Sequence, residues 1–361
     1  MKIAVYHGLP DGGAKRSIDA LCSLLGQRHL LTFYTTPPKT LKGRFLSDFD
    51  ALFIQRHFQK RLASTIDKSH HDVCLVSHDS ILQSPWLLRY LKTPTVFLCQ
   101  EPTRAYYESF LRIDGRLPLP NRLYELVNRA LRNKFESENA RFATRIAANS
   151  IYSVESIFRS YGVISKNIYL GVSPDKFFPL DKKRENQVMI VGNDEPQKAI
   201  RFAIDVLAKI ARSVRPKLLI VSPRRYNAAP LQEYAKTRQV KVEIVNGCEQ
   251  NMVNEYYNQS LLTLAIAYLE PFGLSVIESL AATTPVVAVN EAGFRETMIK
   301  GAGLLLERDV NLFALEVTKL LSDKVGLRNM GRIGRAHVRK SFPWQRSVAK
   351  LELLLTYAQK S

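Results

Sequence analysis

The sequence predicts an α/β protein with two domains, each built on a parallel β-sheet that helices cover. Its 361 residues suit two domains at roughly 100–200 residues each. Short continuous apolar runs alternate with segments of helical periodicity, which is typical of a parallel sheet with helices on both faces. The same alternation begins again after a charged, proline-containing stretch at 178–186. The hydrophobic content of 46% excludes a disordered chain.

The first half begins with a predicted strand at 2–6, a turn that contains Gly8, Gly12 and Gly13, and a helix at 14–25. The apolar residues of this helix recur at helical spacing. The other elements expected in this half are strands at 30–34, 73–77, 95–99, 145–148 and 168–170 and a helix from about residue 154. Strands that alternate with helices imply one parallel sheet.

The second half repeats this order. Strands are expected at 187–191, 217–221, 242–245, 261–267 and 285–289, each followed by a helical segment. A last helix at 343–359 carries apolar side chains on one face and is expected to pack back across the linker. The predicted organisation is a domain at 1–176, a linker at 177–186, a domain at 187–340, and a C-terminal helix at 341–361 packing back towards the first domain. Ligands of such sheets bind at the carboxyl ends of the strands.

The chain is strongly basic, with a formal net charge of +19 and a sequence pI near 9.8. The excess is +10 in residues 1–180 and +9 in residues 181–361. Such a surface attracts polyanions, whether nucleic acid, anionic lipid or phosphorylated small molecules. The four cysteines lie far apart, which favours a reducing compartment over a zinc site or a disulfide framework. The N-terminal apolar stretch is too short for a signal peptide. We therefore expect a cytoplasmic protein, at most peripheral to a membrane.

The sharpest local pattern is the segment from Glu270 to Glu278, where a predicted strand is followed by a helix. Pro271 suits a first helical turn, and the glycine and serine after it leave backbone N–H groups that can hold an anion at the helix N-terminus. One carboxylate would lie on the loop and the other within the helix, gripping hydroxyls on either side of a bound phosphate. The spacing alone is also compatible with an alternative to a binding site, namely an ordinary capped helix with two solvated glutamates.

This segment resembles the E-x7-E element of the retaining group-1 glycosyltransferases, which have the GT-B fold. The likeness continues through 281–288 and 292–296. Further likenesses follow in the family's order at 12–14, 148–150, 171–179, 191–192 and 196–198. The resemblance implies two Rossmann-like domains facing across a cleft with a crossing C-terminal helix. The first domain would lie on the acceptor side, and the second would bind a nucleotide sugar.

The resemblance also implies roles for individual residues. Glu278 would accept hydrogen bonds from the nucleotide ribose, and Glu270 would contact hydroxyls of the transferred sugar. Lys198 would pair with the leaving phosphates and stabilise the charge that grows there. The main-chain N–H groups that would face the diphosphate belong to Phe272, Gly273, Leu274 and Ser275. Gly13 would lie on the donor side, and neither a cofactor nor a metal is expected.

Several positions depart from the family pattern. Asn193 stands where the family usually has arginine, and Ala199 where it usually has glycine. Arg225, with its neighbour Arg224, is a candidate source of the missing positive charge. Gln100 replaces the family's histidine and can hydrogen-bond a sugar hydroxyl but cannot carry a proton. On the acceptor side we expect His78, as a residue lining the cleft, and Arg104.

Other motifs are weaker. Asp48-Phe49-Asp50 imitates a metal-binding D-x-D, but it precedes a helical run and is better explained as a helix N-cap with a buried Phe49. Residues 8–17 lack the lysine that a phosphate loop needs directly after its second glycine. No dinucleotide fingerprint follows the first strand, and His70-His71-Asp72 has no third metal ligand nearby in sequence.

The segment 103–145 interleaves basic and apolar residues, a mixture that suits an anionic bilayer. Its basic residues are Arg104, Arg112, Arg116, Arg122, Arg129, Arg132, Lys134, Arg141 and Arg145, and a second basic stretch holds Lys39, Lys42, Arg44, Arg56, Lys60 and Arg61. The alternative is a solvated helix with its apolar face on the core. We expect a hexosyltransferase that uses GDP-mannose or a UDP-hexose, with a glycan or lipid-linked acceptor in envelope or surface polysaccharide synthesis. A catalytically degenerate sugar-nucleotide-binding protein is one rival. A nucleic-acid-binding protein, the other, lacks any known motif.

Overall fold

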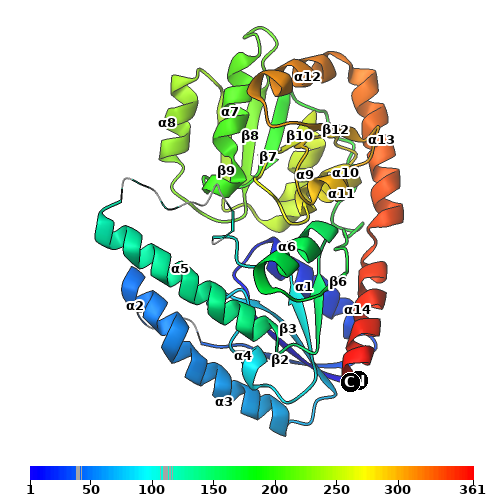
Figure 1. The fold of residues 1–361 in the computed structure, drawn as a ribbon. Helices are drawn as coiled ribbons and strands as arrows, with labels where there is room; N and C mark the ends of the chain where they lie inside the picture. The colour runs from blue at the N-terminus through cyan, green and yellow to red at the C-terminus, as the bar shows by residue number, and fades with distance from the viewer. Residues whose placement is uncertain (38–40, 42, 106, 109–112, 114, 116) are drawn as a thin grey trace. The chain divides into compact units, whose positions relative to one another are not determined.

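The computed structural model describes the whole chain except residues 38–40, 42, 106, 109–112, 114 and 116 (Figure 1). The chain forms two compact units. The first comprises Met1–Tyr169 with Gln345–Ser361, and the second comprises Leu170–Trp344. Among the described residues, no helix is long and apolar enough to cross a membrane.

The first unit is built on a six-stranded parallel sheet with the order β2-β1-β3-β4-β5-β6. Its strands are β1 (Lys2–Gly8), β2 (Leu30–Tyr34), β3 (Val73–Asp79), β4 (Thr95–Cys99), β5 (Arg145–Ala148) and β6 (Lys166–Asn167). Its helices are α1 (Gly13–Leu25), α2 (Arg44–Phe49), η1 (Asp50–Ile54), α3 (Gln55–Lys68), α4 (Leu87–Tyr90), α5 (Leu119–Ala140), α6 (Ile151–Tyr161) and α14 (Trp344–Gln359). The order of strand addition reverses between β1 and β3, so this unit has its topological switch point there.

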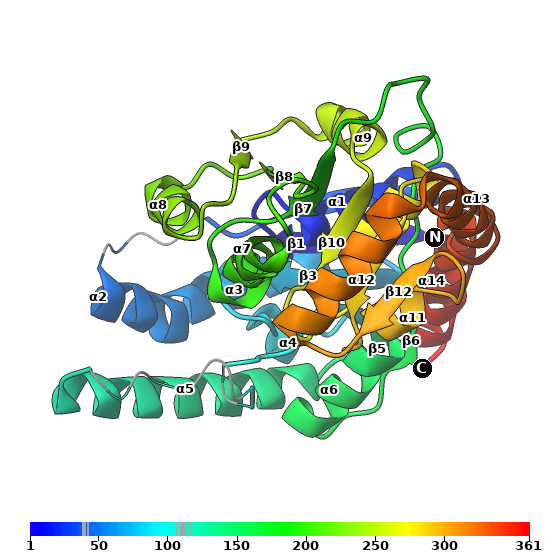
Figure 2. The same ribbon diagram turned by 90° about the horizontal axis from the view of Figure 1, so that it is seen from above.

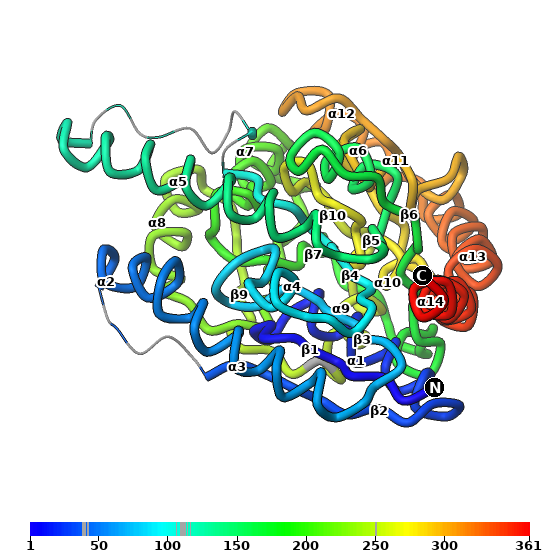
Figure 3. The backbone as a smooth tube through the Cα atoms, turned by 60° about the horizontal axis from the view of Figure 1, so that its bottom comes forward, coloured from blue at the N-terminus to red at the C-terminus, as the bar shows by residue number. Residues whose placement is uncertain are grey.

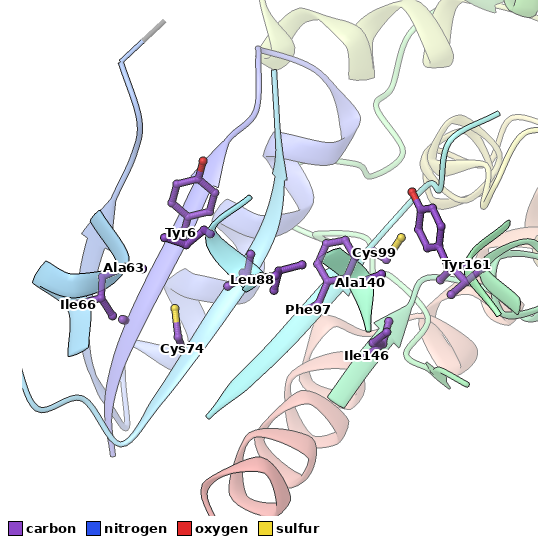
Figure 4. Packing of buried hydrophobic residues seen from close by; sticks show 14 of the residues in the cluster. Tyr6, Ala63, Ile66, Cys74, Leu88, Phe97, Cys99, Ala140, Ile146 and Tyr161 are labelled. Atoms are coloured by element: carbon purple, nitrogen blue, oxygen red, sulfur yellow. The ribbon is translucent and has the colours of Figure 1, made fainter. Parts of the chain in front are cut away.

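The core of the first unit lies between this sheet and its helices (Figure 4). Tyr6 and Phe97 come from the sheet, and Ala63, Ala140 and Tyr161 come from helices packed on it. These side chains are all fully buried or nearly so. The apolar runs of β3 and β4 are therefore fully buried because helices cover the sheet, as in other parallel sheets.

The second unit repeats the architecture with the strand order β12-β11-β10-β7-β8-β9, again all parallel. Its strands are β7 (Gln187–Val191), β8 (Lys217–Ser222), β9 (Val242–Asn246), β10 (Leu262–Ala265), β11 (Val286–Val289) and β12 (Gly303–Leu306). Its helices are η3 (Pro196–Lys198), α7 (Ile200–Lys209), α8 (Ala229–Thr237), α9 (Gln250–Gln259), α10 (Leu274–Ala281), α11 (Phe294–Thr297), α12 (Val310–Ser322) and α13 (Lys324–Ser341). Here the switch point lies between β7 and β10.

The chain enters the second unit after Tyr169, earlier than the boundary at 176 expected from the sequence. The segment 177–186 packs within that unit. The backbone N–H of Phe178 donates to Asn254 Oδ1 (3.2 Å), and that of Leu180 donates to Asn258 Oδ1 (2.8 Å). Both asparagines lie on α9, which holds this stretch against the second sheet.

Helix α14 belongs to the first unit. Glu352 accepts hydrogen bonds from Arg28 Nη1 (2.9 Å) and lies 2.9 Å from His29 Nε2. Ser347 Oγ donates to the carbonyl of Tyr169. Both chain ends therefore lie in this unit (Figure 3).

Candidate functional site

The turn after β7 positions a lysine at the switch point of the second sheet. Gly192 follows the strand, and a Cβ at this position would lie 3.3 Å from Cβ of Lys198, so only glycine leaves ordinary space for the lysine stem. Ala199 then takes the left-handed conformation, with φ 52° and ψ 30°, and starts α7. This conformation normally favours glycine. The alanine that replaces the family's usual glycine therefore takes a conformation that glycine adopts at lower cost.

Lys198 and Glu270 meet at this edge of the sheet. Lys198 Nζ lies 3.1 Å from Glu270 Oε2, although the two residues are 72 positions apart. The pairing follows from the strand order, because β7 and β10 are neighbours and the two residues follow their carboxyl ends. The side chains are 33% and 26% exposed, so solvent screens the pair and an incoming phosphate can compete for the lysine.

Residues 269–273 have a tightly specified backbone. We call them the donor loop, after the role that the family resemblance implies for them. Leu269 has φ 46° and Gly273 has φ 97°. A Cβ on Gly273 would lie 2.8 Å from the ring of Phe294, and a Cβ on Gly293 would lie 2.4 Å from the carbonyl oxygen of Pro271. The backbone N–H of Gly293 also donates to the carbonyl of Glu270 (2.9 Å). The donor loop and the segment around Gly293 are therefore packed backbone to backbone.

Helix α10 begins directly after the donor loop. Phe272 is buried against Phe342, with ring centroids 5.8 Å apart. Leu274 and Ser275 are half-buried on the first turn. Glu278 is 4% exposed, and Tyr257 Oη lies 3.3 Å from its Oε2. A buried carboxylate beside a tyrosine hydroxyl can accept hydrogen bonds from a ligand at a fixed position.

A cluster around Arg308 braces the donor loop, and the sequence analysis missed it. Arg308 forms a bidentate ion pair with Glu291, with both N–O distances 2.8 Å. It also donates to the carbonyls of Ile266 (2.8 Å) and Ala267 (3.2 Å) and lies over the ring of Tyr268. Burial alone would raise the pKa of Glu291, but its bonds with Arg308 hold it below the ordinary value. The sequence signal was weak, because these residues follow three different strands.

Asn193 and Arg225 both contact other residues of the second unit. Asn193 Nδ2 donates to Glu195 Oε1 (3.0 Å), so a carboxylate lies beside Asn193. Arg225 is exposed at the β8–β9 end of the sheet. Its side chain covers Gly247, where a Cβ would lie 2.7 Å from Arg225 Cγ.

In the first unit, His78 is buried and links two loops by hydrogen bonds; it is not the cleft-lining residue that we expected. It is 3% exposed, its Nδ1 lies 2.6 Å from the carbonyl of Gln83, and its Nε2 accepts the backbone N–H groups of Gln100 (2.8 Å) and Glu101 (3.1 Å). Burial lowers the pKa of His78 to about 4, so the ring is neutral near pH 7. Both ring nitrogens thus have protein partners, Nδ1 in the loop after β3 and Nε2 in the loop after β4.

The other expected residues of the first unit gather at the carboxyl end of β4. Gln100 Nε2 donates to the carbonyl of Ala14 (3.0 Å), next to Gly13 at the start of α1. Arg104 Nη1 donates to Glu101 Oε1 (2.8 Å). Gln100 therefore links the loop after β4 to the first turn of α1.

The D-x-D segment is structural. Asp48 lies inside α2, and Asp50 is fully buried and accepts from Gln55 Nε2 (3.1 Å). Phe49 is 47% exposed, so the expectation of a buried phenylalanine was wrong; the helix begins after Gly43, and this ring lies on its outer side. In the described part of the chain, no group of three or more His, Cys, Asp or Glu residues could hold a metal ion.

Two parallel six-stranded sheets with flanking helices define the GT-B class, and the expected fold class is confirmed by solved structures. Sucrose-phosphate synthase from Thermosynechococcus elongatus has a TM-score of 0.76 at 16% identity, with 98% of each chain covered. Anabaena Alr3699/HepE in complex with UDP-glucose has a TM-score of 0.74 at 16% identity, covering 99% of this chain and 100% of that one.

Residues 172–337 match the family model of the glycosyl transferases group 1. The alpha-1,3/1,6-mannosyltransferase ALG2 of Rhizomucor pusillus is 23% identical over 438 residues, which cover 100% of this chain and 92% of that protein. Two further curated relatives match over 54% and 45% of their own lengths. The match to the family model lies within the second unit, Leu170–Trp344, which therefore resembles the glycosyl transferases group 1.

Proposed function

We propose that the protein is a retaining, metal-independent hexosyltransferase that moves a hexose from a nucleotide-diphospho-sugar to a glycan or lipid-linked acceptor. The observation that carries the proposal is the pairing of Lys198 and Glu270 at the β7–β10 switch point. It supports a site in which one cation meets the leaving phosphates and one carboxylate meets the sugar. Glu278, buried beside Tyr257, would bind the ribose.

The chemistry would rest on positioning and electrostatics. The bond between the anomeric carbon and the phosphate oxygen breaks, and the acceptor oxygen bonds to the same carbon on the same face. The leaving phosphate takes the acceptor proton, so no protein side chain needs to act as nucleophile. Lys198 and the N–H groups at the start of α10 would stabilise the growing phosphate charge.

The donor is GDP-mannose or a UDP-hexose. The mannosyltransferase relative supports the first, and the fold shared with a protein crystallised with UDP-glucose is compatible with the second. We place the reaction in the cytoplasm, on or near the inner face of a membrane, in envelope or surface polysaccharide synthesis. Arg225, with Arg224, would add positive charge near the diphosphate. Gly13 would contact the donor, Gln100 would hydrogen-bond a sugar hydroxyl, and Arg104 would contact the acceptor.

The test is a thermal-shift screen with GDP-mannose, UDP-glucose and related sugar nucleotides, followed by donor hydrolysis and transfer assays. A ligand at 100 times its Kd stabilises by about 2.7 kcal/mol, so a true donor is easily detected. Lys198→Met and Glu278→Gln should abolish both the shift and the turnover. Lys182→Met is the matched control, because Lys182 pairs with Glu255 at 2.8 Å on the surface. Loss of activity on chelation, or inversion of the anomeric configuration by NMR, would contradict the proposed mechanism.

A binding protein without turnover is the second candidate, and the contact between Asn193 and Glu195 favours it by placing negative charge near the diphosphate. Sugar-nucleotide binding with no release of nucleoside diphosphate, across a broad acceptor panel, would support this candidate. Restored turnover in Asn193→Arg would show that this substitution limits catalysis.

A further inference from the structure

Two segments of the first unit form a rigid pair that carries no part of the site described above. The segment 44–54, which comprises α2 and η1, lies beside the first half of α5 (Figures 1 and 2). Asp48 ties them together: it accepts hydrogen bonds from Tyr124 Oη (2.6 Å), Asn128 Nδ2 (3.0 Å) and Arg132 Nη2 (2.7 Å). We call residues 44–54 and 119–132 the paired-helix edge.

The paired-helix edge exposes many large apolar side chains. They recur at helical spacing on both segments, and each is between 46% and 73% exposed. These residues are Phe45, Leu46, Phe49 and Phe53 on one segment and Leu119, Leu123, Leu126 and Val127 on the other. Phe49 and Phe53 lie with ring centroids 5.0 Å apart. Concentrated exposed apolar groups of this kind mark interaction surfaces. The first half of α5 therefore does not pack its apolar residues on the core.

On the paired-helix edge the acidic side chains are largely buried, whereas two of the arginines are exposed. Asp50 is fully buried, and the side chains of Asp48 and Glu125 are 17% and 12% exposed because arginines pair with them. Arg44 keeps 54% of its side chain exposed, and Arg122 is also exposed. Arg44 pairs with Glu125, but its side chain is the exposed partner of that pair. The outer surface thus combines apolar groups with the guanidinium groups of Arg44 and Arg122, which complements an anionic bilayer. Two copies of this edge would instead bring like charges together.

We propose that the paired-helix edge docks on an anionic phospholipid bilayer. The phenylalanines and leucines enter the boundary between headgroups and acyl chains, and the arginines contact lipid phosphates. This docking proposal rests on the proposed function in one respect only: a lipid-linked acceptor would be bound at the membrane surface. Membrane binding itself does not depend on the donor site. Of the basic residues considered from the sequence, Arg112, Arg116, Lys39 and Lys42 lie outside the described residues, and the proposal does not use them.

The experiment is vesicle flotation with the full chain. Vesicles of pure phosphatidylcholine are compared with vesicles that contain about 30% phosphatidylglycerol, at low and high salt. We expect binding to the anionic vesicles only, weakened by salt. Phe49→Ser/Phe53→Ser and Leu123→Ser/Leu126→Ser should each lower the partition coefficient by about tenfold or more. The matched control is Phe158→Ser/Ile164→Ser, since those residues are 61% and 82% exposed elsewhere on the same unit.

Several outcomes would overturn the proposal: equal binding to both kinds of vesicle, no binding, or an equal loss in the control. Arg122→Glu, which removes no apolar group, should also weaken binding, and an unchanged partition coefficient would contradict the electrostatic part. Light scattering that shows a dimer, lost in the serine variants and without vesicle binding, would assign the edge to self-association instead. The sugar-nucleotide thermal shift is measured on every variant and should stay unchanged, which separates this test from that of the proposed function.

Discussion

The Arg308 cluster gives the most direct test of how the donor loop is held. Arg308→Met keeps most of the aliphatic stem but removes the ion pair with Glu291 and the hydrogen bonds to the carbonyls of Ile266 and Ala267. The Arg308 side chain is 15% exposed and that of Glu291 is 24% exposed. Removing one partner of a fully buried ion pair costs about 3–5 kcal/mol. Because water can partly reach Glu291, we expect a lower loss of about 2–3 kcal/mol in the free energy of unfolding.

The assay is urea and thermal unfolding of Arg308→Met, Glu291→Gln and the double variant. For a unit of this size, Tm falls by about 2–4 °C for each kcal/mol of lost stability, so we expect Tm to be lower by about 4–12 °C. The double-mutant cycle should give a coupling energy above about 1 kcal/mol, since the two side chains contact each other. Arg295→Met is the control, because Arg295 is exposed and donates to Asn290.

The pH dependence has a definite sign. The folded-state pKa of Glu291 lies below its ordinary 4.5, so the ion pair stabilises the fold above that pH and is lost as the pH falls through the folded-state pKa. Arg308→Met should therefore lose less stability on acidification than the wild type. An unfolding free energy within about 0.5 kcal/mol of wild type, or a coupling energy near zero, would refute the reasoning.

Three further predictions concern other parts of the fold. Burial raises the pKa of Glu136 to about 7 and lowers that of His78 to about 4. As the pH falls from about 6.5 to about 4.5, the glutamate therefore increases the free energy of unfolding and the histidine decreases it. Glu136→Gln removes the opposing carboxyl, so the free energy of unfolding of this variant should fall by up to about 3 kcal/mol on acidification from about pH 6.5. Urea titration at several pH values measures it. A pH dependence parallel to that of the wild type would contradict the prediction. Ala199→Gly should stabilise by about 0.5–1 kcal/mol by relieving its left-handed backbone, whereas Ala203→Gly within α7 should destabilise. Gly293→Ala should cost at least about 1–3 kcal/mol and weaken sugar-nucleotide binding, because its Cβ meets the donor loop; unchanged calorimetric affinity would argue against this packing.

Strands are well predicted both inside the sheets and, in the case of 30–34, at an edge. The expected strands at 30–34, 95–99, 145–148 and 187–191 have the observed bounds. The strand expected at 261–267 is shorter in the structure, ending at Ala265, because the carbonyls of Ile266 and Ala267 bond to Arg308 instead of continuing the ladder. Strand β12 was not predicted from the sequence; it has only four residues, most of them half-buried or exposed. Such a short edge strand lacks a distinctive pattern.

The candidate site shows the same division. Lys198, Glu270 and Glu278 can be proposed from sequence, because their motifs are local and the chemistry depends on residue type. The sequence by itself thus determined the alternation of elements, the glycosyltransferase motifs and the excess of positive charge. Only the tertiary structure decided that Lys198 contacts Glu270, that Arg308 braces the donor loop, and that His78 is an internal connector. These contacts join segments that follow different strands, and strand order is a property of the folded sheet that no local pattern encodes.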